Sequence, residues 1–386
     1  MSVRMARLGD LVEIQGGGTP SKEIPDYWNG QIPWASVKDF KTTEIAETID
    51  SITEQGVANS ATNIIPAGKI LVPTRMAVGK AAINKVPMAI NQDLKALFPA
   101  ANVNVRYLLH SLLANSRVLE RQATGATVKG ITLSVLKSLE IPLPPLDEQK
   151  RIAAILDKAD QLRQKRRQAI AFLDNLTQSI FLEMFGDPVS NPKGWPVKEL
   201  TDFEQFLTSG SRGWAKFYAE KGRPFIRIQN LRNGKLSTDD LIFVNAPDNA
   251  ESRRTLVSGG DVLISITADL GRVAVVPPDL HGGANINQHI ALLRPKGINS
   301  FYLASYLASD GGKKQFSALN RQGVKAGLNF TDVRGLKILT PPMDMQDKFE
   351  QLLISLEARH DQYLIGRDGS ESLFASLQHR AFTGQL

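Results

Sequence analysis

The most constraining feature of this sequence is that it repeats itself once. Residues 68–72 (GKILV) match residues 260–264 (GDVLI) further along the chain. Residues 90–92 (INQ) match residues 286–288 (INQ), so the matching segments keep their order. Ordered matches of this kind indicate a duplicated structural unit. Because the chain has 386 residues, we expect two similar domains rather than one compact core.

Each repeat begins with a part in which short runs of Val, Ile and Thr are broken by Gly, Pro and Asn. Such runs predict short β-strands, as at residues 64–65 and 261–266. Short helices are predicted within the same parts, at residues 105–121 and 300–319. We therefore expect two globular parts of mixed α/β structure.

Each globular part is followed by a segment with the pattern of a long helix. From Asp147 onward, apolar residues recur at alternating spacings of three and four, which is typical of a coiled-coil seam. Gly186 and Pro188 end this pattern, as a C-terminal glycine with a following proline does. Arg166 lies on the seam itself, where it marks either the register of the pairing or a water-filled gap between helices.

The second long helix is predicted to start near Met345, and its seam is weaker. It contains Gly366 and Gly369, each about 1 kcal/mol less favourable than alanine in a helix, so packing against a partner must hold it. The expected partner is the first long helix, in an antiparallel coiled coil that would place the globular parts at opposite ends with pseudo-twofold symmetry. The predicted fold class is α+β. The predicted boundaries are 1–145 and 188–342 for the globular parts and 146–187 and 343–386 for the helices.

Composition narrows the class of protein only slightly. Lys and Arg outnumber Asp and Glu by 46 to 39, and this net charge of +7 is compatible with a polyanionic partner without requiring one. The chain has no cysteine, which excludes disulfides, thiolate zinc sites and a cysteine nucleophile. The sequence shows neither a signal-peptide pattern nor an apolar run long enough to span a bilayer, so we expect a cytoplasmic protein without a membrane partner.

Motifs for catalysis are missing from the sequence. Residues 16–20 (GGGTP) lack the spacing of a cofactor-binding glycine loop, and Gly79-Lys80 is followed by Ala81 rather than the hydroxyl residue of a P-loop. Neither a nuclease-like carboxylate cluster nor a metal-binding histidine spacing occurs. We therefore expect a non-catalytic chain without a cofactor or metal. Two similar basic parts on a rigid spacer suit a ligand with two sites at a fixed distance, as duplex DNA is.

Several motifs resemble those of the specificity subunit of type I restriction-modification systems. They lie at residues 8–14 with 16–20, at 32–39, and, most specifically, at 125–131 and 141–152. The resemblance covers essentially the whole chain. It implies a non-catalytic DNA-binding subunit with two target recognition domains, each of which reads one half of a bipartite site.

The resemblance also implies partner proteins. The two long helices would be the conserved regions that separate the recognition domains and hold two methylation subunits. Those subunits would carry adenosylmethionine, and a motor-nuclease restriction subunit would use ATP and magnesium. The second half departs from the family pattern at residues 208–212 and 322–328, and reading two different half-sites would require such divergence.

Candidate DNA contacts follow from the chemistry of recognition, in which Arg, Lys, Asn and Gln read base edges and basic groups bind phosphates. In the first domain the candidates are Ser36, Lys38, Thr74, Arg75, Lys80 and Lys129, with Arg75 and Lys80 preferred. In the second domain they are Arg212, Arg227, Gln229, Asn230, Thr267, Arg272 and Lys325. Lys129 and Lys325 lie in matching loops and are expected at phosphates. The recurring Asn-Gln pairs at 91–92 and 287–288 are expected to have a shared structural role.

Other side chains admit more than one interpretation. Trp34 and Trp214 are expected to be buried, although a DNA-facing surface is the alternative. The basic run at residues 163–167 would face spacer DNA, an acidic partner or solvent. For the whole chain, the alternative function is a coiled-coil adaptor that joins two partner proteins without binding DNA. Salt dependence would separate the two, since phosphate-driven binding weakens steeply with salt. An unrecognised enzyme would instead need a strongly perturbed residue in a pocket.

Overall fold

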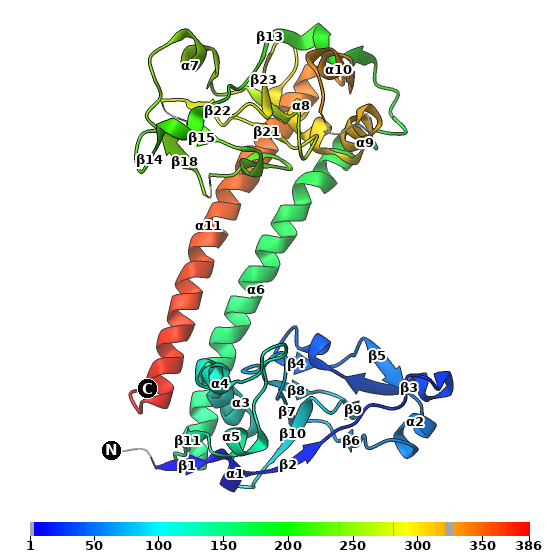
Figure 1. Cartoon of the computed structure of the whole chain (residues 1–386), viewed down its shortest axis with the longest axis vertical. Helices are drawn as coiled ribbons and strands as arrows, with labels where there is room; N and C mark the ends of the chain where they lie inside the picture. Colours follow the sequence, from blue (N-terminus) through cyan, green and yellow to red (C-terminus); the bar gives the residue numbers. More distant parts are fainter. Residues whose placement is uncertain (1–3, 239, 281, 321–326) are drawn as a thin grey trace. The chain divides into compact units, whose positions relative to one another are not determined.

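The structure is a computed structural model that describes residues 4–238, 240–280, 282–320 and 327–386 (Figure 1). It has the predicted α+β fold, with β-rich globular parts and long helices. The chain divides into two compact units, of which one comprises Met1–Arg167 with Ile365–Leu386 and the other comprises Gln168–Leu364. Both long helices therefore contribute residues to both units.

The globular part of the first unit contains two sheets that enclose a core. The five-stranded sheet has the order β2 (Val12–Gly16), β10 (Leu94–Pro99), β7 (Ile70–Pro73), β8 (Ala82–Asn84) and β4 (Glu44–Ile45). The four-stranded sheet has the order β5 (Asp50–Ile52), β3 (Trp28–Ala35), β9 (Met88–Ile90) and β6 (Ile64–Ile65). Leu71 and Ala96 of the first sheet pack with Ile90 of the second in one buried cluster.

The other face of the five-stranded sheet packs on helices. Ile70 and Val72 of β7 share a core with Tyr107 of α3 and Ile152 of the first long helix, so β7 is buried on both faces. The helices of this part are α1 (Leu8–Leu11), α2 (Glu54–Ala58), α3 (Val105–Ala114), α4 (Ser116–Gln122) and α5 (Leu133–Lys137). A short antiparallel pair, β1 (Met5–Arg7) with β11 (Glu140–Pro142), completes it.

The globular part of the second unit repeats this topology. Its larger sheet has the order β13 (Glu204–Ser209), β23 (Ile290–Pro295), β20 (Val262–Ser265), β21 (Val273–Val275), β17 (Gly234–Leu236) and β16 (Leu231–Arg232). The smaller has β14 (Tyr218–Ala219), β18 (Ile242–Val244), β15 (Arg223–Ile226), β22 (Ala284–Ile286) and β19 (Leu256–Val257). The parallel pairs occur at matching places, β4–β8 with β17–β21 and β3–β9 with β15–β22. The sequence repeat is therefore a repeat of fold.

The helices of the second part also correspond to those of the first. They are α7 (Ala250–Arg254), α8 (Ser300–Ala308), α9 (Asp310–Leu319) and α10 (Phe330–Arg334), and β12 (Val197–Glu199) pairs with β24 (Lys337–Leu339). Each predicted short helix is in fact two helices. The first is divided at Asn115, whose side chain donates to the carbonyl of Ser111. The second is divided at Ser309, whose hydroxyl caps α9. Short polar side chains compete in this way with helix hydrogen bonds.

The two long helices are α6 (Leu146–Phe185) and α11 (Met343–Phe382), each of 40 residues. In the first unit Ile152 and Leu156, near the start of α6, share a core with Phe374, near the end of α11. In the second unit Phe185, at the end of α6, packs at 5.4 Å between ring centroids against Phe349, near the start of α11. Opposite helix ends thus meet in each unit, and the predicted antiparallel pairing is confirmed. Among the described residues, none of the helices has the length and apolar character needed to cross a bilayer.

A buried glutamine joins each long helix to its globular part. Gln149 accepts from the backbone N–H of Asn104 at 2.8 Å and donates to the carbonyls of Pro144 and Asn102 at 2.9 and 3.1 Å. Gln346 does the same in the second repeat, accepting from Asn299 N–H at 2.9 Å and donating to a proline carbonyl at 2.8 Å.

A buried tyrosine strengthens each joint. The hydroxyl of Tyr107 donates to the carbonyl of Pro142 at 2.8 Å, and that of Tyr302 donates to the carbonyl of Leu339 at 2.9 Å. Burial raises the pKa of both hydroxyls above its ordinary value. The two joints therefore use the same pair of residue types to fix where a long helix leaves a globular part.

Candidate nucleic-acid interface

The connection after β7 meets a second loop to form what we call the first tip, residues 74–80 and 124–131. The backbone of Met76 donates to the carbonyl of Lys129 at 3.0 Å, and Ile131 donates to Thr74 at 2.8 Å. Arg75 forms a β-bridge with Gly130 between these hydrogen bonds. The pairing brings Arg75 and Lys129, which are distant in sequence, onto adjacent backbone segments.

The candidate residues on the first tip differ in how free their side chains are. Arg75 is 56% exposed and lies 3.5 Å from the carboxylate of Asp93. Lys80 is exposed, but its ammonium donates to the carbonyl of Phe40 at 3.0 Å. Thr74 is buried, and its hydroxyl donates to the carbonyl of Asp93 at 3.0 Å. Of the preferred pair, Arg75 projects from the tip and Lys80 is held against its own domain.

Ser36 caps the short 3-10 helix η2 (Val37–Asp39), and Lys38 lies within it. Asp39 accepts from the backbone N–H of Ser36 at 2.8 Å and from its hydroxyl at 3.2 Å. The Ser36 oxygen in turn accepts from Lys38 N–H at 3.3 Å. Ser36 and Asp39 thus form a capping box. Ser36 is buried in this cap, whereas the Lys38 side chain is exposed.

The connection after β20 forms the second tip, residues 266–272 and 327–328, with the same backbone pattern. Leu328 donates to the carbonyl of Ile266 at 2.8 Å, and Thr267 forms a β-bridge with Gly327. The Thr267 hydroxyl bonds the Nδ1 atom of His289, and Arg272 pairs with Asp269. Lys325 lies outside the described residues.

Three further candidates of the second domain, Arg227, Gln229 and Asn230, lie at another 3-10 helix, η5 (Ile228–Asn230). Asn230 is buried, and its oxygen accepts from Arg227 N–H at 2.9 Å, which repeats the cap at Ser36. The Arg227 guanidinium donates to the carbonyl of Asp240 at 2.8 Å. With the Gln229 amide oriented so that its oxygen faces Arg227, the guanidinium also donates to that oxygen at 2.7 Å. Gln229 and Arg212 are both exposed.

Beside the second tip lies a surface hollow of about 420 Å³ that our sequence analysis missed. Arg232, Arg272 and Lys313 line it together with Asp269. Arg232 precedes a tight turn in which Asn233 and Gly234 both have positive φ, at 49° and 88°. An Asn-Gly pair is a strong hairpin signal, and it could have placed Arg232 beside a turn. No comparable local signal marks Lys313.

The asparagines of the recurring Asn-Gln pairs have a shared structural role, and both tryptophans are buried. Asn91 accepts from the N–H of Asp93 at 3.2 Å, and Asn287 accepts from the N–H of His289 at 3.1 Å, so both shape the same turn. Trp34 and Trp214 are 5% and 6% exposed, and therefore pack inside their domains.

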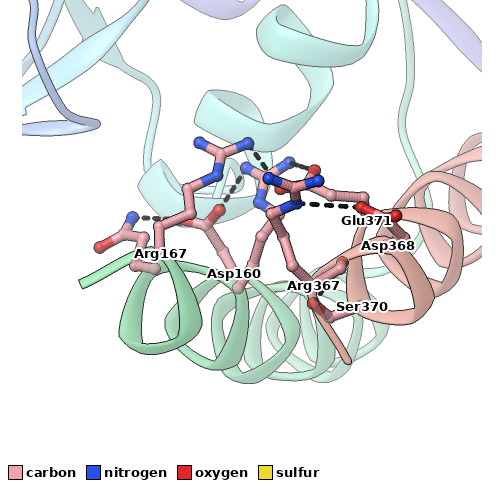
Figure 2. A network of polar contacts seen from close by, with 8 residues as sticks. Asp160, Arg167, Arg367, Asp368, Ser370 and Glu371 are labelled. Carbon is pink, nitrogen blue, oxygen red and sulfur yellow. Dashed lines mark hydrogen bonds and ion pairs between the residues drawn. The ribbon is translucent and has the colours of Figure 1, made fainter. Parts of the chain in front are cut away.

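The basic run on α6 faces α11 rather than solvent alone. Arg163 lies 3.2 Å from Glu371, and Arg167 pairs with the same carboxylate at 2.5 Å (Figure 2). Arg166 donates to the carbonyl of Gly366. These three arginines thus contribute to helix pairing, while Lys165 stays exposed.

In the part of the chain that the structure describes, no group of three or more His, Asp or Glu residues could hold a metal ion. The strongest pKa displacements belong to Tyr107 and Tyr302, which are packed in cores and serve the joints.

Comparisons with known proteins agree with the duplicated architecture. The family model of the type I restriction modification DNA specificity domain matches residues 2–171 and again residues 192–360. The type I restriction enzyme MjaIX specificity subunit of Methanocaldococcus jannaschii is 27% identical over 371 residues, 90% of this chain and 85% of that protein. The EcoR124I/EcoR124II specificity subunit of Escherichia coli is 41% identical over 167 residues, 42% of this chain and 41% of that protein.

A solved structure shares the fold. The crystal structure of the type I restriction-modification system S subunit from M. genitalium matches with a TM-score of 0.62 at 16% identity, covering 98% of this chain and 96% of that one.

Proposed function

Because the chain belongs to the family of type I restriction-modification DNA specificity subunits, we propose that its first and second tips each bind one half of a bipartite site in double-stranded DNA. The chain is a specificity subunit with two target recognition domains, one in each matched segment, and it is non-catalytic. Its place is in a type I restriction-modification complex.

One observation supports the tips as the DNA-binding elements. The backbone pairings that connect Thr74 with Ile131 and Ile266 with Leu328 are the same in both domains, whereas the side chains that the two tips carry differ. A constant scaffold with varied exposed side chains suits two domains that read different sequences. The net charge of +7 is compatible with a polyanionic ligand.

We propose different roles for the candidate residues, from the contacts of the described ones and, for Lys325, from the sequence alone. We assign base contacts to Arg75, Gln229 and Thr267. Gln229 and Thr267 also bond within their own domain, to Arg227 and His289, but remain at least partly exposed. We assign phosphate contacts to Lys38, Lys129, Arg212, Arg272 and Lys325, with Lys80 adding charge. Ser36, Thr74, Arg227 and Asn230 are engaged in bonds that hold the loops, and we assign them to the scaffold.

The long helices are proposed to hold two methylation subunits. Apolar side chains are exposed on both helices, among them Phe172 at 65%, Ile365 at 75% and Leu373 at 50%. Exposed apolar residues of this size on a helix pair favour a protein partner. The methylation subunits would carry adenosylmethionine, and a restriction subunit would add ATP- and magnesium-dependent cleavage in the cytoplasm.

The proposal is tested by retaining a random duplex pool on the full chain in complex with its methylation subunits and sequencing the bound DNA. We expect two short motifs at one fixed separation, and exchange of one recognition domain should replace one motif only. Bound DNA without an enriched motif would contradict half-site reading. Absence of bound DNA would favour a coiled-coil adaptor.

Salt dependence supplies a second test. Lys129→Ala and Arg212→Ala should each reduce the slope of log affinity against log salt by about 0.9, since each removes one phosphate contact. Lys85→Ala is the matched control, because this exposed lysine follows β8 at the end away from the first tip. An unchanged slope in both tip variants would contradict the assignment of phosphate contacts.

A further inference from the structure

At one equivalent position in the fold, the two tips carry different pairs of interacting residues. In the first domain Thr74 donates its N–H to the carbonyl of Asp93 at 2.8 Å, and in the second Ile266 donates to the carbonyl of His289 at 2.9 Å. Asp93 and His289 therefore occupy equivalent positions under the tips. The next tip residue contacts them in each case, as Arg75–Asp93 and as Thr267–His289.

Asp93 is a nearly buried residue whose backbone is held by a hydrogen bond. It is 7% exposed, and its backbone N–H is fixed by the side chain of Asn91 at 3.2 Å. The nearby ammonium of Lys95 donates to the carbonyls of Gln92 and Leu94, at 2.8 and 3.2 Å. The carboxylate of Asp93 is therefore held in place where one oxygen lies 3.5 Å from Nη1 of Arg75 and can orient the guanidinium.

Arg75 keeps donors available beyond this anchor. Nη1 lies 3.5 Å from Asp93 Oδ1, and more than half of the side chain is exposed. A guanidinium carries five donors in a rigid fork, so contact with a carboxylate at one nitrogen leaves others to bind outward. Holding the fork in place also lowers the entropy that is lost on binding. A bidentate contact, in which arginine donates hydrogen bonds to both O6 and N7 of guanine, is the commonest specific contact in the major groove.

The second tip lacks this chemistry at the same position. Thr267 presents a short neutral hydroxyl that is bonded to His289 Nδ1, and the other ring nitrogen of His289 lies 3.2 Å from the Gln288 amide. A threonine hydroxyl accepts or donates to several bases and selects guanine poorly. Because Thr267 and His289 stand where the first tip has Arg75 and Asp93, the two tips should prefer different bases at this position.

We propose that Asp93 is a positioning residue that aims Arg75 at a guanine in the first half-site, and that the exchanged pair Thr267–His289 removes this preference from the second. The inference rests on the proposed function and deepens it by naming the base class and the residue that orients its reader.

The test uses the full chain in complex with its methylation subunits and a random duplex pool. For the unaltered protein we expect guanine at one position of the first motif. Arg75→Ala should reduce discrimination for guanine there by about tenfold or more, with the second motif unchanged. Arg75→Lys should also lose discrimination while the salt slope is kept, because the charge remains and the fork does not.

The decisive variant is Asp93→Asn, which keeps the shape and removes the charge. We expect a loss of guanine preference at the position that Arg75→Ala identifies, with the other positions of both motifs retained. A merely structural role would weaken every position together and lower the thermal midpoint. Asp26→Asn, at an exposed aspartate of the same domain, is the control and should change neither motif.

A reciprocal variant tests sufficiency. Thr267→Arg combined with His289→Asp should add a guanine preference to the second motif, and thermal unfolding shows whether this variant is folded. Where it is not, Asp93→Asn decides alone. A normal bipartite motif that Asp93→Asn leaves unchanged overturns the inference, as does a uniform loss over all positions in Arg75→Ala. If the unaltered complex enriches no bipartite motif, the proposed function itself fails.

Discussion

The guanidinium of Arg166 on α6 donates a hydrogen bond to the backbone carbonyl of Gly366 on α11. A Cβ atom at Gly366 would lie 2.6 Å from Nη1 of Arg166, so the arginine occupies the space that the missing side chain leaves. The polar residue in the apolar seam of α6, Arg166, therefore contacts a glycine of α11, Gly366. This contact favours one register of the helix pair.

Gly366→Ala should stabilise the protein less than helix propensity alone predicts. The substitution gains about 1 kcal/mol of helix propensity, but the added methyl group must shift the end of the Arg166 side chain, which weakens its hydrogen bond. We therefore expect little net change in the free energy of unfolding, measured by urea denaturation. Gly369→Ala is the matched control, since nothing lies within 4 Å of its Cβ, and it should stabilise by about 1 kcal/mol. Equal gains from both would contradict the contact.

Gln149→Ala and Gln346→Ala should each destabilise by about 2 to 4 kcal/mol. Both side chains are almost fully buried, and their removal leaves backbone groups of the joints without partners at about 1 to 3 kcal/mol each. Gln161→Ala, at an exposed position on α6, should change stability by less than about 0.5 kcal/mol. Urea midpoints of the three variants give the comparison, and similar values for all three would show that the joints contribute little.

Stability should fall with rising pH above about pH 10. Burial raises the pKa of Tyr107, Tyr302 and Tyr306 in the folded protein, while in the unfolded chain these groups titrate near 10. The stabilisation is therefore complete below pH 10 and is lost as the pH rises toward the folded pKa values. Tyr302→Phe should make this decline shallower by about 1.4 kcal/mol per pH unit, whereas Tyr363→Phe, at an exposed site, should not. Denaturation between pH 9 and 11 measures the slope.

Asp261→Asn should destabilise the second domain by about 2 kcal/mol, because it breaks an ion pair whose carboxylate is buried and whose arginine is partly exposed. The Asp261 carboxylate is 1% exposed and accepts from Nε and Nη2 of Arg294, both at 2.8 Å, and these hydrogen bonds raise the pKa of Arg294. Asp269→Asn breaks an exposed pair with Arg272 and should cost less than about 1 kcal/mol. Thermal unfolding of both variants checks the difference, and an equal effect would contradict it.

Residue type predicts some features of the candidate site, whereas others depend on how the chain folds. Exposed basic residues on loops could be identified from residue type, and Arg75, Lys38 and Lys129 are indeed exposed. The capping role of Ser36 and the contact of Lys80 with the Phe40 carbonyl could not, because they depend on how loops fold back on their own domain. Arg75 and Asp93 are 18 residues apart, and only the pairing of β7 with β10 brings them together.

The duplication, the two long helices and the family could all be inferred from the order and spacing of residues along the chain. These follow from the order of matched segments and from spacings of three and four, which are local properties of the chain. In contrast, the contact of Arg166 with Gly366, 200 residues away, and the different residue pairs at equivalent positions of the two tips are visible only in the folded protein. Such contacts depend on burial and backbone geometry that are settled only when distant segments pack, so no window of the sequence contains them.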